Sequence, residues 1–95
     1  MVAGMEMQAV AIEIDEERVV ESLQEAAKTL DSAEGELALD FSSVRRIDAG
    51  SIRALEELAR NAAAKDVKVV LRGVNVSVYK VLRVVKMASR FSFVL

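Results

Sequence analysis

The sequence predicts an α/β domain built on a four- to five-stranded, mostly parallel sheet. Apolar runs typical of strands alternate with segments of helical periodicity along all 95 residues, in the order β-α-β-α-β-α-β. Neighbouring parallel strands need crossover connections, and the three predicted helices supply them. The length suits one hydrophobic core and no linker-like stretch interrupts it, so residues 1–95 are expected to form a single domain.

The first half of the chain is predicted to contain two strands and one helix. Residues 5–14 are apolar on both alternating faces, as in a central strand, and residues 2–7 could fold back to add a further strand. Apolar residues at helical spacing then predict an amphipathic helix over 16–31, with Asp15 as its N-cap. Residues 36–41 are expected to form the second strand.

The second half is predicted to contain two helices and two strands. These are a helix at about 50–64, a strand at 67–72, a helix at about 76–88 and a strand at 91–95. Gly73 is expected to end its strand, and Asn75 or Ser77 can cap the helix that follows. The buried face of that helix is predicted to consist of Val78, Val81, Leu82 and Val85.

The composition excludes several classes of chemistry. There is no Cys and no His, so the chain has no thiolate nucleophile, no imidazole base and no Cys/His zinc site. Asp40 and Asp48 could converge at one rim, where paired carboxylates can bind Mg²⁺ or transfer protons, but no third ligand is evident. We therefore expect a protein that is not an enzyme and that uses no metal or cofactor.

The apolar segments also bear on localisation. No apolar run approaches the length of a membrane-spanning helix. The first residues lack the basic start and apolar stretch of a signal peptide. We expect a cytoplasmic protein that does not span a membrane.

Charge is distributed unevenly along the chain. Residues 1–66 hold all fifteen acidic residues and seven basic ones, a net −8, whereas the last 29 residues hold six basic residues and no acid. A basic surface is therefore predicted on the last helix. The two halves could neutralise each other, or the basic face could bind an acidic partner, an anionic membrane or a second copy of the chain in a homodimer. Nucleic acid is not expected, because the basic residues lack interleaved aromatics and the pI is about 5.2.

Residues 37–55 are the most informative stretch, because a buried strand leads there through a short loop into a helix. A helix N-terminus offers unpaired backbone N–H groups and the positive end of the helix dipole. Such a corner suits a phosphate, an anion or a partner contact. The candidate partner-binding residues at this corner are Ser42, Ser43, Arg45, Arg46, Asp48, Ala49, Gly50, Ser51 and Arg53, and those beside it on the last helix are Asn75, Val76 and Tyr79.

Some of these residues also have a purely structural interpretation. Ser42 and Ser43 could simply hold the loop through side chain–backbone hydrogen bonds. Tyr79 falls on the outer face of its helix, where it could bind a partner or cover the edge of the core. Gly73 could allow a partner backbone to approach closely instead of only ending a strand.

The segment Asp40-Phe-Ser-Ser-Val-Arg-Arg-Ile-Asp48-Ala-Gly-Ser-Ile-Arg-Ala-Leu resembles the central motif of STAS domains, the family of anti-sigma-factor antagonists and sulfate-transporter tails. Residues 70–82 resemble a later segment of the same family. The resemblance implies a small domain with a mixed sheet, helices on one side and a function exerted through protein contact. In the antagonists, an anti-sigma kinase phosphorylates a serine of the motif and so abolishes binding, whereas other members are small subunits of lipid-transport ABC complexes.

The chain departs from the family motif at the phosphoacceptor. Aligning Asp48 with the aspartate of the motif puts Ala49 at its first serine, Gly50 at the phosphoacceptor and Ser51 at its glycine. Ser51 is therefore a candidate for a shifted phosphorylation site, where the helix dipole and the nearby arginines would favour a phosphoryl group. The alternative is that Ser51 is a first-turn residue with a local hydrogen bond.

Three functions follow as hypotheses. The first is a non-catalytic interaction module, resembling anti-sigma-factor antagonists in signalling and transcription regulation, that binds a kinase-like partner through the loop and the N-terminus of the second helix. The second is a structural subunit of a lipid-transport ABC complex, bound to its ATPase subunit, or of a stressosome-like assembly. The third is a small domain that binds an anion or nucleotide through the same N-terminus and its arginines.

Overall fold

A computed structural model describes residues 11–94, which form four strands and three α-helices. The strands and α-helices are β1 (Ile12–Glu13), α2 (Val19–Ala27), β2 (Glu36–Asp40), α3 (Ala49–Ala64), β3 (Lys68–Arg72), α4 (Val76–Val84) and β4 (Ser92–Val94). Three single-turn 3₁₀ helices, η1 (Glu16–Arg18), η2 (Leu30–Ser32) and η3 (Ala88–Arg90), lie between them. The predictions for residues 1–10, including the hairpin over 2–7 and the start of the first strand, lie outside the described residues.

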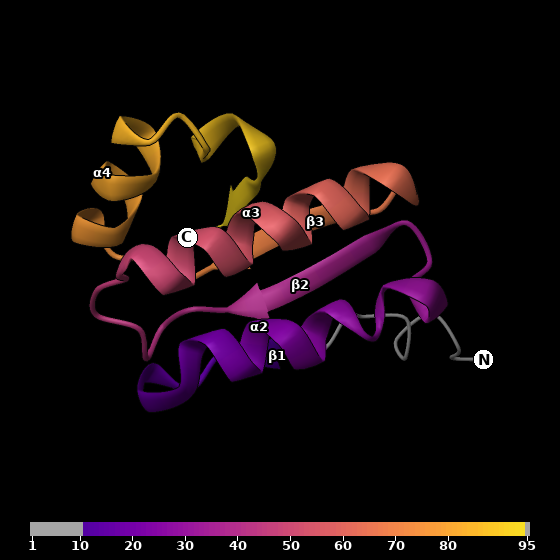
Figure 1. Cartoon of the computed structure of the whole chain (residues 1–95), viewed down its shortest axis with the longest axis horizontal. Coiled ribbons are helices and arrows are strands. Elements are labelled where there is room, and N and C mark those ends of the chain that lie inside the picture. Colours follow the sequence, from indigo (N-terminus) through magenta and orange to yellow (C-terminus); the bar gives the residue numbers. More distant parts are fainter. Residues whose placement is uncertain (1–10, 95) are drawn as a thin grey trace.

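The sheet has the order β1-β2-β3-β4, and each strand pairs in parallel with the next. Each connection is a crossover between adjacent strands, and such crossovers are almost always right-handed. Three crossovers of one hand that step in one direction put their helices on the same face of the sheet. Figure 1 shows α2 and α3 side by side in front of the strands, with α4 at one end. The predicted parallel α/β architecture is confirmed.

The core lies between the sheet and this helical layer. Leu39 of β2 and Leu71 of β3 are register partners, and both are completely buried. They pack in one cluster with Leu23 of α2, Leu55 of α3 and Leu82 of α4. Because the cluster is aliphatic apart from a few aromatic rings, the hydrophobic effect is the main force between the layers.

The first predicted helix, over 16–31, is divided in the structure. Asp15 caps η1, because its carboxylate accepts a hydrogen bond from the Glu17 N–H at 3.0 Å. Arg18 then leaves the helical region, with φ −141° and ψ 50°, and α2 begins at Val19. The predicted capping residue is right, and the predicted continuity of the helix is wrong.

The prediction for the last helix, 76–88, is too long by one turn. α4 ends at Val84 because Lys86 adopts φ 64°, and the Met87 N–H then bonds back to the Leu82 carbonyl at 2.8 Å. This Schellman ending turns the chain away. Val85 is 39% exposed as a result, so its predicted place on the buried face is wrong.

Candidate functional site

The loop between β2 and α3 is anchored by apolar side chains at two places. Phe41 and Val44 are buried in the core, and the Phe41 N–H donates to the Arg72 carbonyl at 2.8 Å. Ser42, Ser43, Arg45 and Arg46 are exposed. The loop therefore presents its polar side chains from a fixed backbone.

The start of the loop is held by Asp40 and Gly73. The Ser42 hydroxyl donates to Asp40 Oδ1 at 2.6 Å, and the Ser42 N–H donates to the same oxygen at 2.9 Å. These bonds, the hydroxyl first, lower the pKa of Asp40, and Arg72 adds a smaller effect against the opposing effect of burial. Gly73 has φ +72°, and a Cβ there would lie 2.9 Å from the Ser42 Cβ. The close approach at Gly73 is thus made by this chain's own loop.

Asn75 joins the loop to α4. Its Oδ1 accepts a hydrogen bond from the Val78 N–H at 2.7 Å, which makes Asn75 the N-cap of α4. Its Nδ2 donates to the Arg45 carbonyl at 3.0 Å and lies 3.4 Å from the Val44 carbonyl. One side chain therefore accepts a hydrogen bond from a backbone N–H at the start of α4 and donates to backbone carbonyls of the loop, about thirty residues earlier in the sequence. Of the two predicted caps, Asn75 is the one used.

Asp48 is the N-cap of α3. Its Oδ1 accepts a hydrogen bond from the Ser51 N–H at 2.9 Å, and its pKa is lowered by that N–H first and by the Ser51 side chain second. Ser51 is only 4% exposed, whereas Ala49 and Gly50 are exposed. The predicted first-turn hydrogen bond of Ser51 is therefore present at its backbone N–H. With so little of Ser51 exposed, its hydroxyl is a poor target for a kinase in this conformation.

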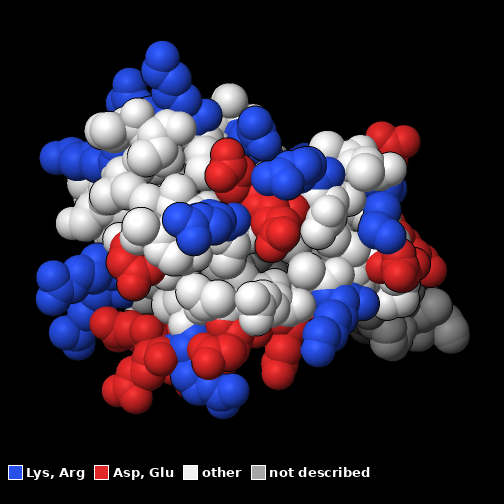
Figure 2. Space-filling model, viewed as in Figure 1, with Lys and Arg blue, Asp and Glu red and all other residues white. Residues whose placement is uncertain are grey.

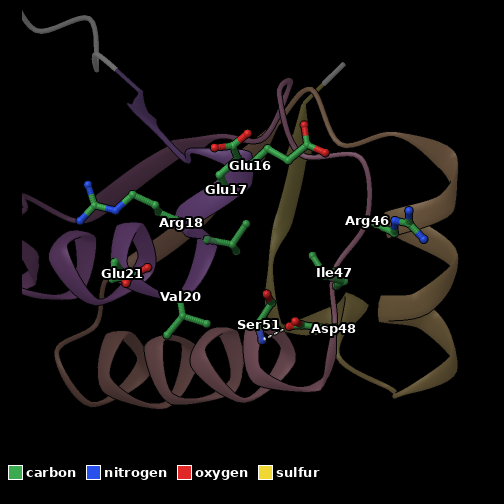
Figure 3. Close-up of a pocket in the computed structure, with 10 residues that line it drawn as sticks. Glu16, Glu17, Arg18, Val20, Glu21, Arg46, Ile47, Asp48 and Ser51 are labelled. Carbon is green, nitrogen blue, oxygen red and sulfur yellow. Dashed lines mark hydrogen bonds between the residues drawn. The ribbon is translucent and has the colours of Figure 1, made fainter.

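A hollow of about 450 Å³ lies between this helix start and the α2 side of the domain (Figure 3). Asp48, Ser51 and Ile47 line it from the loop and α3, and Glu17 and Glu21 are among those that line it from η1 and α2. Figure 3 shows Ser51 and Asp48 side by side at the start of α3, with the Arg46 side chain directed away from them. Four carboxylates and two arginines, Arg18 and Arg46, line the hollow, so acidic groups are in excess there.

The acidic wall, Glu16, Glu17 and Glu21, is the part of the site that sequence reasoning missed. From the sequence alone, Glu16 and Glu17 directly after the N-cap Asp15 are explained by the helix dipole, without any binding role. A usable signal was present: parallel strands with same-handed crossovers bring all helix starts to one edge of the sheet. The start of α2 was therefore bound to lie near the start of α3.

The remaining predicted residues fall into two groups. Arg45 lies 4.0 Å from Glu16 in an exposed ion pair, and Arg53 is exposed on α3 outside this hollow. Such an ion pair contributes little to stability. Asn75, Val76 and Tyr79 line a separate hollow on the α4 side of the loop. The structure thus places the predicted residues on both sides of one loop, not in one pocket.

Two further findings concern residues 11–94. No group of three or more carboxylates there is arranged to hold a metal ion. None of the helices within this range combines the length and the apolar character needed to cross a membrane.

The fold and the corner together define a class: a small parallel α/β domain that exposes a tightly held loop at the start of a capped helix. The family model described as "Mlab, STAS domain" matches residues 8–94. The chain therefore belongs to the STAS domain family, as the motif at 40–55 predicted. No curated protein matches the chain closely enough to identify a relative.

Proposed function

We propose that this domain is a non-catalytic interaction module that binds a protein partner through the exposed loop 42–46 and the first turn of α3. The main observation in support of this proposal is that the corner is both exposed and held in a fixed conformation. Ala49 and Gly50 are open to solvent, while Asp48 and Asn75 fix the backbone around them. A preordered surface loses less conformational entropy on binding than a flexible one.

We propose in addition that binding at this corner is constitutive. A phosphorylation switch at the position that the family motif uses needs an accessible hydroxyl there, but position 50 is glycine and the neighbouring Ser51 is buried. This favours the second hypothesis, a structural subunit such as the accessory domain of a transport ATPase, over a kinase-regulated antagonist. In both cases the partner is a protein and the contact surface is the same.

The electrostatics argue against the third hypothesis, an anion or nucleotide site. The Asp48 carboxylate already accepts the Ser51 N–H that an anion would need, and acidic residues outnumber Arg18 and Arg46 around the neighbouring hollow. A phosphate there would meet like charges.

The test is an affinity capture that compares Gly50→Glu with the unmodified chain. A Cβ at Gly50 meets neighbouring atoms only at 3.6 Å or more, and an acid is favourable in the first turn of a helix, so the variant is expected to fold. It is expected to lose the partner, because a charged side chain then projects from the contact surface. Arg60→Glu, on the exposed far half of α3, is the matched control and should retain it.

The identity of the captured protein separates the two leading hypotheses. An ATPase subunit supports the structural role, and a kinase of the GHKL type supports the antagonist role. Equal capture by Gly50→Glu and the unmodified chain would rule out this corner as the contact surface. Incubation with a captured kinase and ATP, followed by mass spectrometry, would contradict constitutive binding if Ser51 became phosphorylated.

A further inference from the structure

A second hollow, of about 330 Å³, lies between the start of α4 and the end of β4. Its lining is mostly apolar and consists of Val74, Asn75, Val76, Tyr79, Phe93 and Val94. The Tyr79 and Phe93 rings meet edge to face with centroids 5.0 Å apart. This pair fixes one wall of the hollow and leaves the rest of it open to solvent.

Several of the large apolar side chains around this hollow are exposed. Val76 is 69% exposed, Val94 44% and Tyr79 38%. Within residues 11–94, every large apolar side chain that is exposed belongs to residue 76 or later. Exposed apolar side chains that gather around a concave site are typical of a binding surface.

Basic residues border the hollow without acidic partners. Lys80 follows Val76 by four residues and Arg83 follows Tyr79 by four, so each lies on the same side of α4 as an exposed apolar residue. In the described part of the chain the ion pairs within 4.0 Å are Arg45–Glu16 and Lys65–Asp31, and neither involves α4. Figure 2 shows basic side chains over α4, and acidic side chains with some basic ones among them along the α2 edge. The positive charge of α4 is therefore available to a partner.

We propose that the α4–β4 hollow binds an acidic peptide segment of another protein. The segment inserts an aromatic or branched apolar side chain against Tyr79 and Val76, and its carboxylates face Lys80 and Arg83. The apolar anchor supplies affinity, and the charges supply orientation and a fast association rate. This proposal does not depend on the function of the α3 corner, which lies on the other side of the loop.

Two other occupants fit the observations less well. A second copy of the chain would bring its acidic side, but the acidic α2 side of residues 11–94 exposes no large apolar side chain to insert. An anionic membrane suits a helix whose whole apolar face is free. The apolar face of α4 is instead used internally, since Val78 and Leu82 are buried in the core.

The experiment is a selection from a phage-displayed random peptide library on the immobilised chain at low salt. The enriched peptide is then synthesised and titrated into the ¹⁵N-labelled chain. We expect enriched sequences in which acids flank an aromatic or branched residue, with amide shifts confined to residues 74–83 and 93–94. Raising the salt to about 0.5 M should weaken binding at least about tenfold, because screening removes the charge contribution.

Two variants that are expected to fold normally test whether the peptide binds in the α4–β4 hollow. Val76→Asp places an acid in the exposed first turn of α4, where the dipole favours it, and should lower peptide affinity at least about tenfold. The double variant Lys80→Glu, Arg83→Glu should do the same, and raising the salt should no longer weaken its binding, because salt then screens a repulsion. Arg60→Glu, exposed on α3, is the control and should bind normally.

Each of several outcomes would overturn the proposal. The first is that the enriched peptides contain no excess of acidic residues. The second is that the peptide shifts amide signals of the loop 42–51 instead of those of α4. The third is that Val76→Asp binds the peptide with unchanged affinity. If the chain binds no peptide but binds phosphatidylcholine vesicles that contain phosphatidylserine, and Val76→Asp abolishes this binding, the α4–β4 hollow is a membrane-binding surface. Self-association in sedimentation that the same variant abolishes would assign it to a second copy. Because none of these readouts involves Gly50, a failure here is distinct from a failure at the α3 corner.

Discussion

Asn75 offers the sharpest test of how this site is held together, because one side chain performs two separable tasks. Its Oδ1 caps α4 through the Val78 N–H, and its Nδ2 donates to the Arg45 carbonyl. Serine is as good an N-cap as asparagine but has no second group to reach the loop. Asn75→Ser therefore removes the loop contact alone, whereas Asn75→Ala removes both.

The magnitudes follow from the bonds lost. One good hydrogen bond, at 3.0 Å to Arg45, contributes about 1 kcal/mol net, so Asn75→Ser should lower the free energy of unfolding by that amount. Loss of the cap costs about 1 kcal/mol more, so Asn75→Ala should lose about 2 kcal/mol. In a domain of this size each 1 kcal/mol lowers Tm by about 4–8 °C.

The assay is urea unfolding followed by circular dichroism, with thermal melts alongside. Asn61→Ser, on the exposed surface of α3, is the control, and it should change stability little because the two residues have similar helix propensities. If Asn75→Ser is as stable as the unmodified chain, the loop bond contributes nothing. If it is as unstable as Asn75→Ala, the two tasks are not separable and the reasoning fails.

Three further predictions concern backbone conformation and pH. Gly73→Ala should lower the free energy of unfolding by at least about 2 kcal/mol in urea unfolding, because it combines φ +72° with a Cβ contact of 2.9 Å. Gly35→Ala, at φ +89° with nothing within 4 Å of the added Cβ, should lower it by only about 1 kcal/mol. Equal losses of stability would refute the argument that Gly73 is needed for the close approach of Ser42. Lys86→Gly should raise the free energy of unfolding by up to about 1 kcal/mol, because glycine adopts φ 64° without strain, and a lower urea midpoint would contradict this. The pKa values of Asp40 and Asp48 are lowered in the folded state, so the stability they contribute is complete above the unfolded value of about 3.9 and is lost as the pH falls through the folded values. Stability measured from pH 7 down to about 2 should therefore fall less steeply in the double variant Asp40→Asn, Asp48→Asn than in the unmodified chain.

Much of the fold could be predicted because its signals are local. The period of apolar residues identified the helices and strands, and the capping residues Asp15 and Asn75 marked two of the helix starts. The helix ends were predicted less well. α4 ends at a left-handed Lys86 instead of a glycine, and a lysine carries no sequence signal for that conformation.

For the candidate site too, some features could be predicted from local sequence and others depended on the tertiary structure. Gly50, Ser51 and the exposed loop residues could be chosen from the motif alone. The burial of Ser51 could not, because it depends on how α3 packs against its neighbours. The acidic wall contributed by Glu17 and Glu21 depends on two helices that are distant in sequence lying side by side.

The amino-acid order by itself determined the alternation of strands and helices, the single core, the STAS motif and the absence of thiol and imidazole chemistry. These are properties of composition and of neighbours along the chain. Only the tertiary structure decided that Gly73 receives this chain's own Ser42, that Asn75 holds a loop thirty residues away, and that an apolar hollow stays open beside the basic α4. The physical reason is that each of these features is a contact between segments far apart in sequence, and packing of the whole core selects which segments meet.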